Sequence, residues 1–222
     1  MLEGIKVLSF THYLQGPSAA QALADLGADV VKIEACKGAY ERGWSGCNTY
    51  KNGVSVFYLM ANRNQRDLAI DLKSEEGRET IYTLIRDKGY DVIIENFRPG
   101  VMDKLGLGYE KLKEINPRVV YCSCTGYGSA GPKAKKPGQD LLLQGMSGLA
   151  ALTGPSDHPP MPAGTALVDQ HGAILAALGI VSAVYDRDRT GIGHKVDASL
   201  LGSALDLQIE PLNYFMNGGE LT

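Results

Sequence analysis

A strand–helix–strand pattern at the beginning of the chain constrains the fold most. Residues 5–10 and 29–34 are short apolar runs with the length and composition of buried strands. Between them, Gly16-Pro17 begins a helical pattern over residues 18–26 that Gly27 ends. Because two strands joined in this way lie parallel and side by side, the segment predicts a βαβ crossover.

The same alternation continues along the chain. Further strands are expected at residues 68–72, 91–95, 119–123 and 194–198. Further helices are expected at residues 74–88, 101–105, 109–115, 140–151, from 172 onward, and 199–217. We therefore predict an α/β fold with a Rossmann-like, doubly wound and mostly parallel sheet. The first loop, residues 11–17, lacks the glycine fingerprint of dinucleotide folds, so NAD is not indicated.

Charge and composition exclude several classes of partner. The net charge of −3 argues against a general nucleic-acid binder, which needs a basic face. The N-terminus has neither the basic nor the apolar region of a signal peptide. The longest apolar stretch, residues 173–185, is expected to be too short to cross a bilayer. These features predict a cytoplasmic protein without a membrane partner.

The four cysteines do not form a disulfide or metal pattern. Cys36, Cys47, Cys122 and Cys124 have no framework spacing. Cys122 and Cys124 are two residues apart in a predicted strand and therefore share one face. We expect a buried pair of thiols there and no metal site.

Asp169 interrupts the chain where an apolar run meets a helical pattern. Residues 166–168 are expected to be extended, and Gly172 opens a long Ala/Leu/Ile helix. Asp169 is then either the N-cap of that helix or a reactive carboxylate presented at its N-terminus. Local sequence leaves both interpretations open.

Several loops are expected to meet at the carboxyl ends of the parallel strands, where open α/β sheets bind ligands. They are residues 11–15, 34–38, 96–100, 125–138 and 169–172. Their glycine amides, aromatic rings and cations suit a phosphorylated nucleotide. For Lys133, Lys135 and Lys136 a solvated surface loop is the alternative interpretation.

Motifs spread over most of the chain resemble the N-terminal half of a family III CoA-transferase, the group that contains formyl-CoA and carnitine CoA-transferases. They occupy residues 2–8, 15–17, 26–34, 62–66, 71–78, 95–100, 105–106, 116–121, 126–132, 144–148 and 153–154. Asp169, followed by Gly172, falls where that family has its catalytic aspartate. The order and spacing of these motifs make the resemblance specific.

The resemblance implies a transfer of CoA from an acyl-CoA to a small free carboxylic acid. Asp169 would attack the thioester, and an aspartyl mixed anhydride and an aspartyl-CoA thioester would follow. Backbone amides near the Gln170–Gly172 turn would stabilise the oxyanions. The resemblance implies that no cofactor or metal is permanently bound. It also implies that longer chains form an interlocked homodimer.

The family's CoA contacts, carried over by position, fall mainly in four loops. They are Leu14, Gln15, Asn62, Arg63, Asn64, Gln65, Asn96, Phe97, Arg98, Lys104, Lys136, Gly138, Gln139 and Asp140. The chain departs from the family pattern at Gln65, which replaces a commonly basic residue, and at Lys104, which replaces arginine.

Two other functions are compatible with the same resemblance. An acyl-CoA racemase or epimerase of the superfamily would use a histidine at position 139, but the chain has Gln139, which cannot exchange a proton. His171 is expected to form only local hydrogen bonds. A non-catalytic CoA-binding fragment is the second alternative. Residues 1–205 are expected to form the large CoA-binding domain, and residues 206–222 the start of a linker to a small domain.

Overall fold

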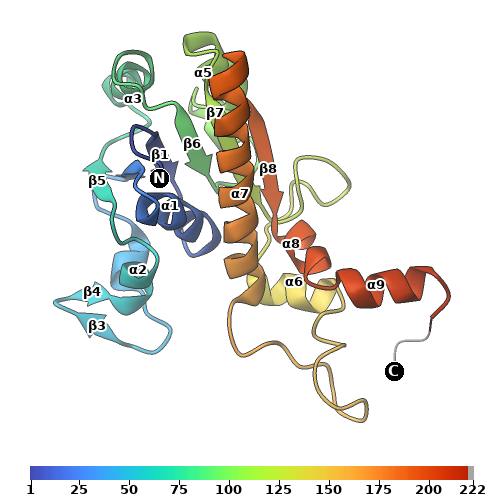
Figure 1. Ribbon diagram of the computed structural model, residues 1–222. Helices are drawn as coiled ribbons and strands as arrows, with labels where there is room; N and C mark the ends of the chain where they lie inside the picture. Colours follow the sequence, from blue (N-terminus) through green and yellow to red (C-terminus); the bar gives the residue numbers. More distant parts are fainter. Residues whose placement is uncertain (220–222) are drawn as a thin grey trace.

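A six-stranded parallel sheet forms the centre of the molecule (Figure 1). The computed structural model describes residues 1–219. The strands are β1 (Lys6–Phe10), β2 (Asp29–Glu34), β5 (Arg66–Ala69), β6 (Val92–Glu95), β7 (Val120–Thr125) and β8 (Lys195–Ser199). Their order is β5-β2-β1-β6-β7-β8, which confirms the predicted α/β class and the first βαβ crossover.

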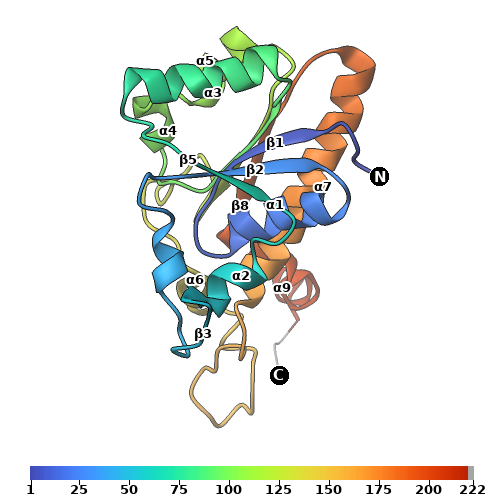
Figure 2. The same ribbon diagram turned by 90° about the vertical axis from the view of Figure 1, so that its left-hand side faces the viewer.

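Helices cover both faces of this sheet (Figure 2). They are α1 (Gln15–Asp25), α2 (Val56–Met60), α3 (Glu75–Asp87), α4 (Val101–Lys104), α5 (Tyr109–Ile115), α6 (Asp140–Met146), α7 (Leu167–Thr190), α8 (Leu200–Asp206) and α9 (Ile209–Met216). Helices α1 and α7 pack on one face, and α3, α4 and α5 pack on the other. A 3₁₀ turn, η1 (Tyr40–Gly43), and a small hairpin of β3 (Tyr50–Lys51) and β4 (Val54–Ser55) follow β2.

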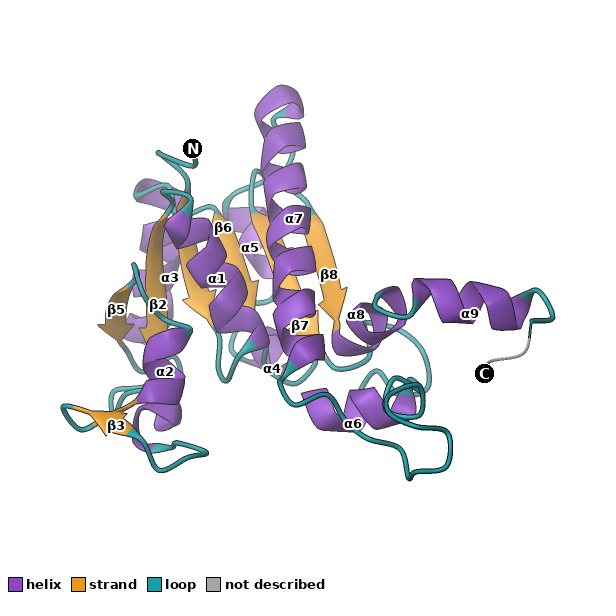
Figure 3. Ribbon diagram, turned by 60° about the horizontal axis from the view of Figure 1, so that its bottom comes forward, coloured by secondary structure: helices purple, strands orange, loops and turns teal. Residues whose placement is uncertain are grey.

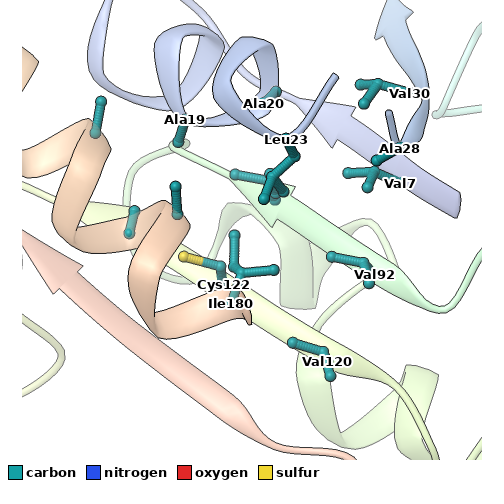
Figure 4. Packing of buried hydrophobic residues seen from close by; sticks show 14 of the residues in the cluster. Val7, Ala19, Ala20, Leu23, Ala28, Val30, Val92, Val120, Cys122 and Ile180 are labelled. Carbon is teal, nitrogen blue, oxygen red and sulfur yellow. The ribbon is translucent and has the colours of Figure 1, made fainter. Parts of the chain in front are cut away.

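The four central strands β1, β2, β6 and β7 are mostly apolar because both faces of the sheet are buried there, whereas the edge strands β5 and β8 are largely exposed. Val7 of β1 faces α1 and α7, whereas the next residue, Leu8, faces α3 and α5. Figure 4 shows the first of these cores, where Leu23 of α1 and Ile180 of α7 belong to the same cluster as Val92 and Cys122 on one face of the sheet. Cys122 and Cys124 are both buried with their sulfur atoms 3.9 Å apart, as the two-residue spacing predicted.

The order of the strands reverses between β1 and β6. From β1 the chain proceeds outward through β2 and β5, and from β6 it proceeds the other way through β7 and β8. The loops after β1 and β6 therefore diverge to opposite faces of the sheet and leave a crevice between them. This switch point is where the topology alone places a ligand.

Several expected boundaries were wrong. The helix expected over residues 199–217 is two helices, because Pro211 has no amide and cannot continue a helix begun at residue 199. Helix α6 ends at Met146, well before residue 151, since Gly148 has a φ of +90°. Strand β5 lies at Arg66–Ala69 and not at 68–72.

Helix α7 is longer than its most apolar stretch suggested. It begins at Leu167, so residues 166–168 are not an extended run. Among residues 1–219 it is the helix that is long and apolar enough to cross a membrane, contrary to the expectation from residues 173–185 alone. In the structure its buried face packs against α1, β7 and β8 as a core helix.

The proposed division at residue 205 stays a prediction. Helix α8 ends at Asp206, and α9, which has no buried residue, extends away from the sheet (Figure 3). The beginning of the expected linker is therefore helical. Its residues 220–222 lie outside the described residues.

Two glycines lie in contact at the base of the loop after β7. A Cβ on Gly138 would lie 2.3 Å from Gly126 Cα, and one on Gly126 would lie 2.6 Å from Gly138 Cα. The chain thus leaves and re-enters the site at one point, and residues 127–137 form a closed loop. This crossing sets the position of Gln139 and Asp140 relative to the end of β7.

Replacing Gly138 by alanine should therefore destabilise the protein. The added methyl group meets backbone that cannot rotate away, and we expect a loss of about 1–3 kcal/mol in unfolding free energy, measured by urea denaturation. Gly145→Ala is the matched control, because nothing lies within 4 Å of its Cβ in α6. That control should be neutral or stabilising by about 0.5–1 kcal/mol. Equal effects of the two substitutions would contradict the close crossing.

Candidate functional site

A cavity of about 770 Å³ opens at the carboxyl ends of the strands, beside the switch point between β1 and β6. It contains most of the residues predicted to bind a ligand. These are Leu14, Gln15, Asn96, Phe97, Arg98, Lys136, Gly138, Gln139, Asp140 and Asp169. They come from four loops that are far apart in the sequence, as expected for a parallel sheet.

The remaining predicted residues do not line this cavity. Arg63 forms an ion pair with Asp25, and Asn64 Nδ2 donates to the same carboxylate at 2.7 Å. Asn62 Nδ2 donates to the Tyr58 carbonyl at 2.8 Å. Gln65 is half-buried with its Nε2 3.5 Å from the Ala61 carbonyl, and Lys104 is an exposed residue at the end of α4. Their part in ligand binding stays a prediction.

Asp169 lies in the first turn of α7 and is not its N-cap. The N-cap position belongs to Ala166, whose side chain has no capping group. The carboxylate of Asp140, at the start of α6, accepts a hydrogen bond from the Asp169 amide at 2.9 Å. Asp140 therefore satisfies a free amide at the start of α7 that an N-cap side chain would normally satisfy. The N-cap interpretation of Asp169 was wrong, and the Asp169 side chain is left for the cavity.

The expected amide donors after Asp169 are also engaged elsewhere. Gln170 N donates to the Ala166 carbonyl as part of the helix. Residues 170–172 are helical and do not form a turn, because α7 begins five residues before Gly172. The amides of residues 170–172 therefore do not form the expected turn of donors beside Asp169.

The environment of Asp169 raises the pKa of its carboxyl group to about 7. Burial is the largest cause, because it disfavours the charged form, and the nearby Asp140 carboxylate adds to the effect. No residue within 1–219 forms a hydrogen bond or ion pair with this carboxylate. Asp169 thus has no hydrogen-bond or ion-pair partner among residues 1–219, and its own carboxyl group changes charge near neutral pH. A strongly shifted pKa in a cavity is typical of reactive groups.

Gln15 presents an amide to the same part of the cavity. It is the first residue of α1 and only 4% exposed, and its Nε2 has no hydrogen-bond partner among the described residues. A Cβ on Gly172 of α7 would lie 2.6 Å from that nitrogen, so the Gln15 amide lies directly against Gly172. Gly172 is three residues after Asp169 and shares its face of the helix. Gln15 therefore places an unused donor against Gly172, one helical turn from Asp169, in the wall of the same cavity, where a buried polar group is expected to find a partner.

The Asn96 side chain uses both of its polar atoms within the protein. Its Oδ1 accepts from His12 N at 2.8 Å, and its Nδ2 donates to the His12 carbonyl at 2.7 Å. This pair of hydrogen bonds joins the loops after β1 and β6 across the switch point. Asn96 lines the cavity as predicted. Because both polar atoms of its side chain already bind His12, its observed role is to hold the cavity wall.

Cations and aromatic rings line the outer part of the cavity. Arg98 and Lys136 are exposed, and neither has an ion-pair partner among residues 1–219. Tyr13, Trp44 and Phe57 also line it, and the rings of Trp44 and Phe57 are in edge contact at 4.9 Å. Aromatic rings were expected from the loop at residues 11–15, which holds Tyr13, but Trp44 and Phe57 were not predicted. The local signal for Trp44 was the Gly-, Tyr- and Asn-rich composition of residues 38–53, which has no helical or strand period.

No histidine lines the cavity within the described residues. Position 139 holds a neutral glutamine, and the Nε2 of His171 lies 2.7 Å from Asp206 Oδ2 of α8. The expected local role of His171 is confirmed. Among residues 1–219 the site therefore offers a carboxyl group with a raised pKa, a buried amide donor without a partner, and two exposed cations.

Comparisons with known proteins point to one family. Residues 2–222 match CoA-transferase family III. An acyl-CoA transferase of Fusarium pseudograminearum is 41% identical, over 93% of this chain and 46% of its own length. A formyl-CoA:oxalate CoA-transferase of Streptomyces coelicolor is 40% identical, over 93% of this chain and 49% of its own. The chain thus spans about half the length of these curated relatives.

Solved structures show the same similarity. A CAIB/BAIF family protein of Brucella suis is 39% identical, with a TM-score of 0.91 over 99% of this chain and 58% of its own. A Mycobacterium tuberculosis protein is 33% identical, with a TM-score of 0.87 over 98% of this chain and 58% of its own. The resemblance inferred from the motifs is confirmed: the chain belongs to CoA-transferase family III.

Proposed function

We propose that this chain carries the CoA-binding and nucleophilic part of an enzyme that moves CoA from an acyl-CoA to a free carboxylic acid. The observation that carries the proposal is the Asp169 carboxyl group, which has no partner among residues 1–219 and lies in a cavity also lined by the Gln15 amide and by exposed Arg98 and Lys136. Relatives named as acting on oxalate and glutarate support a small acid as acceptor. A cytoplasmic homodimer of longer chains belongs to the same proposal.

The first step would be attack by an Asp169 oxygen on the thioester carbonyl. The C–S bond breaks, CoA leaves as a thiolate, and an acyl-aspartyl anhydride remains. The thiolate then attacks the aspartyl carbonyl, which gives an aspartyl-CoA thioester and releases the first carboxylate. An acceptor carboxylate reverses these two steps and leaves with the CoA. Since one carboxylate replaces another, each exchange is nearly thermoneutral.

Each step passes through a tetrahedral oxyanion that needs a hydrogen-bond donor. Gln15 Nε2 is a buried donor without a partner in the described residues, one helical turn from Asp169, and we assign it this role in place of the amides of residues 170–172. A fixed donor of this kind acts without rearrangement because it is held by buried packing. Loss of one such donor typically slows a reaction by about 10²–10³-fold.

The outer end of the cavity suits the phosphorylated part of CoA. Arg98 and Lys136 lie there without competing carboxylates, and the pocket aromatic rings can stack on an adenine base. Gln139 cannot exchange protons, so the site does not support the racemase alternative. A binding protein without turnover remains the alternative that experiment must exclude.

Covalent trapping tests the nucleophile directly. After incubation with an acyl-CoA, intact-mass analysis should show an added CoA or acyl group that hydroxylamine removes and that peptide mapping places on Asp169. Asp169→Ala should abolish the adduct because it removes the attacking oxygen, whereas Asp157→Ala, in an exposed loop, should keep it. Saturable CoA binding without any adduct would favour the non-catalytic alternative.

The pH dependence of adduct formation follows from the raised pKa of Asp169. Only the ionised carboxylate attacks, so the rate should fall as pH drops through about 7 and level off above it. Asp140→Asn removes the neighbouring negative charge but keeps an oxygen for the Asp169 amide. That variant should therefore shift the midpoint to lower pH, as measured by rapid-quench mass spectrometry. Asp157→Asn should leave the midpoint unchanged; an unshifted midpoint in Asp140→Asn would refute the electrostatic link.

A further inference from the structure

The residues between β1 and α1 form a sharp corner that delivers Gln15 to the cavity. Tyr13 has a φ of +61°, in the left-handed region that a bulky residue rarely adopts. Such a conformation persists only where the surroundings hold it. Two residues later Gln15 begins α1, so the placement of its side chain depends on this corner.

Three side chains from three other elements hold the corner. Lys32 of β2 donates to the Thr11 carbonyl at 2.7 Å, and Asn96 binds both backbone groups of His12. Glu41 of η1 completes the set. Its Oε1 accepts the Tyr13 amide at 2.6 Å and lies 3.1 Å from His12 Nδ1.

Glu41 is placed for this contact at some energetic cost. It is only 2% exposed, and burial of a carboxylate is unfavourable unless it is well paired. Here the Tyr13 amide, the His12 ring and the nearby buried Lys32 compensate. Hydrogen bonds from the Tyr13 amide and His12 keep the pKa of Glu41 below its usual range, so it stays charged at neutral pH despite its burial.

The aromatic residues around Glu41 close the corner from outside. The His12 ring stacks on Tyr40 with centroids 5.2 Å apart and meets Phe97 edge-on at 5.5 Å. Tyr13 packs edge-on against Tyr40 at 5.2 Å. Tyr40 precedes Glu41 in the same 3₁₀ turn. The turn therefore contacts His12 and Tyr13 through both the Glu41 carboxylate and the Tyr40 ring.

From these contacts we infer that Glu41 is a positioning residue: it holds the His12–Tyr13 corner so that the Gln15 amide stays aimed at Asp169. The inference rests on the function proposed above. Glu41 does not line the cavity and touches no reacting atom; it acts through Gln15. Displacement of an oriented group by about 1 Å can slow a reaction by about 10²-fold, which sets the expected scale.

The kinetic test is a double-mutant cycle on the rate of aspartyl adduct formation. Glu41→Ala should slow the adduct by about 10–100-fold while CoA affinity changes by less than about threefold. In a Gln15→Ala background the same substitution should slow it by less than about threefold, since the group that it positions is gone. Glu41→Gln keeps an oxygen for the Tyr13 amide and should stay within about threefold of the wild type. Additive effects, or an unaffected Glu41→Ala, would overturn the inference.

A second measurement does not depend on activity. Hydrogen–deuterium exchange of a peptide covering residues 10–16 should rise at least about tenfold in Glu41→Ala, because the Tyr13 amide loses its acceptor. Glu110→Ala, an exposed carboxylate on α5, serves as the control and should not change it. Unchanged exchange in Glu41→Ala disproves the positioning role. If the wild type forms no adduct, the proposed function fails, and this exchange experiment still decides whether Glu41 holds the corner.

Discussion

The paired hydrogen bonds between Asn96 and the His12 backbone hold together a site that the sheet alone would leave open. At the switch point the chain runs outward in both directions, so the loops after β1 and β6 have no strand between them and no ladder bonds to join them. One amide side chain supplies both a donor and an acceptor to a single residue of the other loop. The cavity wall, the corner at Tyr13 and the start of α1 all depend on this connection.

The presentation of Asp169 depends on a division of tasks between two carboxylates. Asp140 accepts the first-turn amide of α7 and also binds Gln144 Nε2 at 2.5 Å, so it is satisfied and structural. Asp169 has no partner in the described residues and carries the raised pKa. Identical side chains about thirty positions apart thus acquire opposite properties because their surroundings differ. The negative charge of the nearby Asp140 raises the pKa of Asp169 further.

Much of the fold was predictable because its signals are local. Strands such as Val7-Leu8 are apolar on both faces, and the helix expected from residue 74 is α3, whose N-cap Ser74 accepts a hydrogen bond from the Gly77 amide. The site was predictable in outline, since loops at one end of a parallel sheet must converge. The sequence could not reveal that Asp140 caps α7, because this hydrogen bond joins separate helices. It also hid the corner contacts of Glu41, which depend on how a 3₁₀ turn folds back over the loop after β1.

The contact between Gly126 and Gly138 has a consequence for how such a protein can change. Because residues 127–137 leave and return through a single point, the length of their outer part, residues 130–136, can change without a shift of Asp140. Doubling the length of such a loop costs only about 0.6 kcal/mol in closure entropy. The segment that carries Lys133, Lys135 and Lys136 is therefore an exchangeable module. Substitutions or insertions in that segment can add contacts to a substrate without a change in the positions of Asp140 and Asp169.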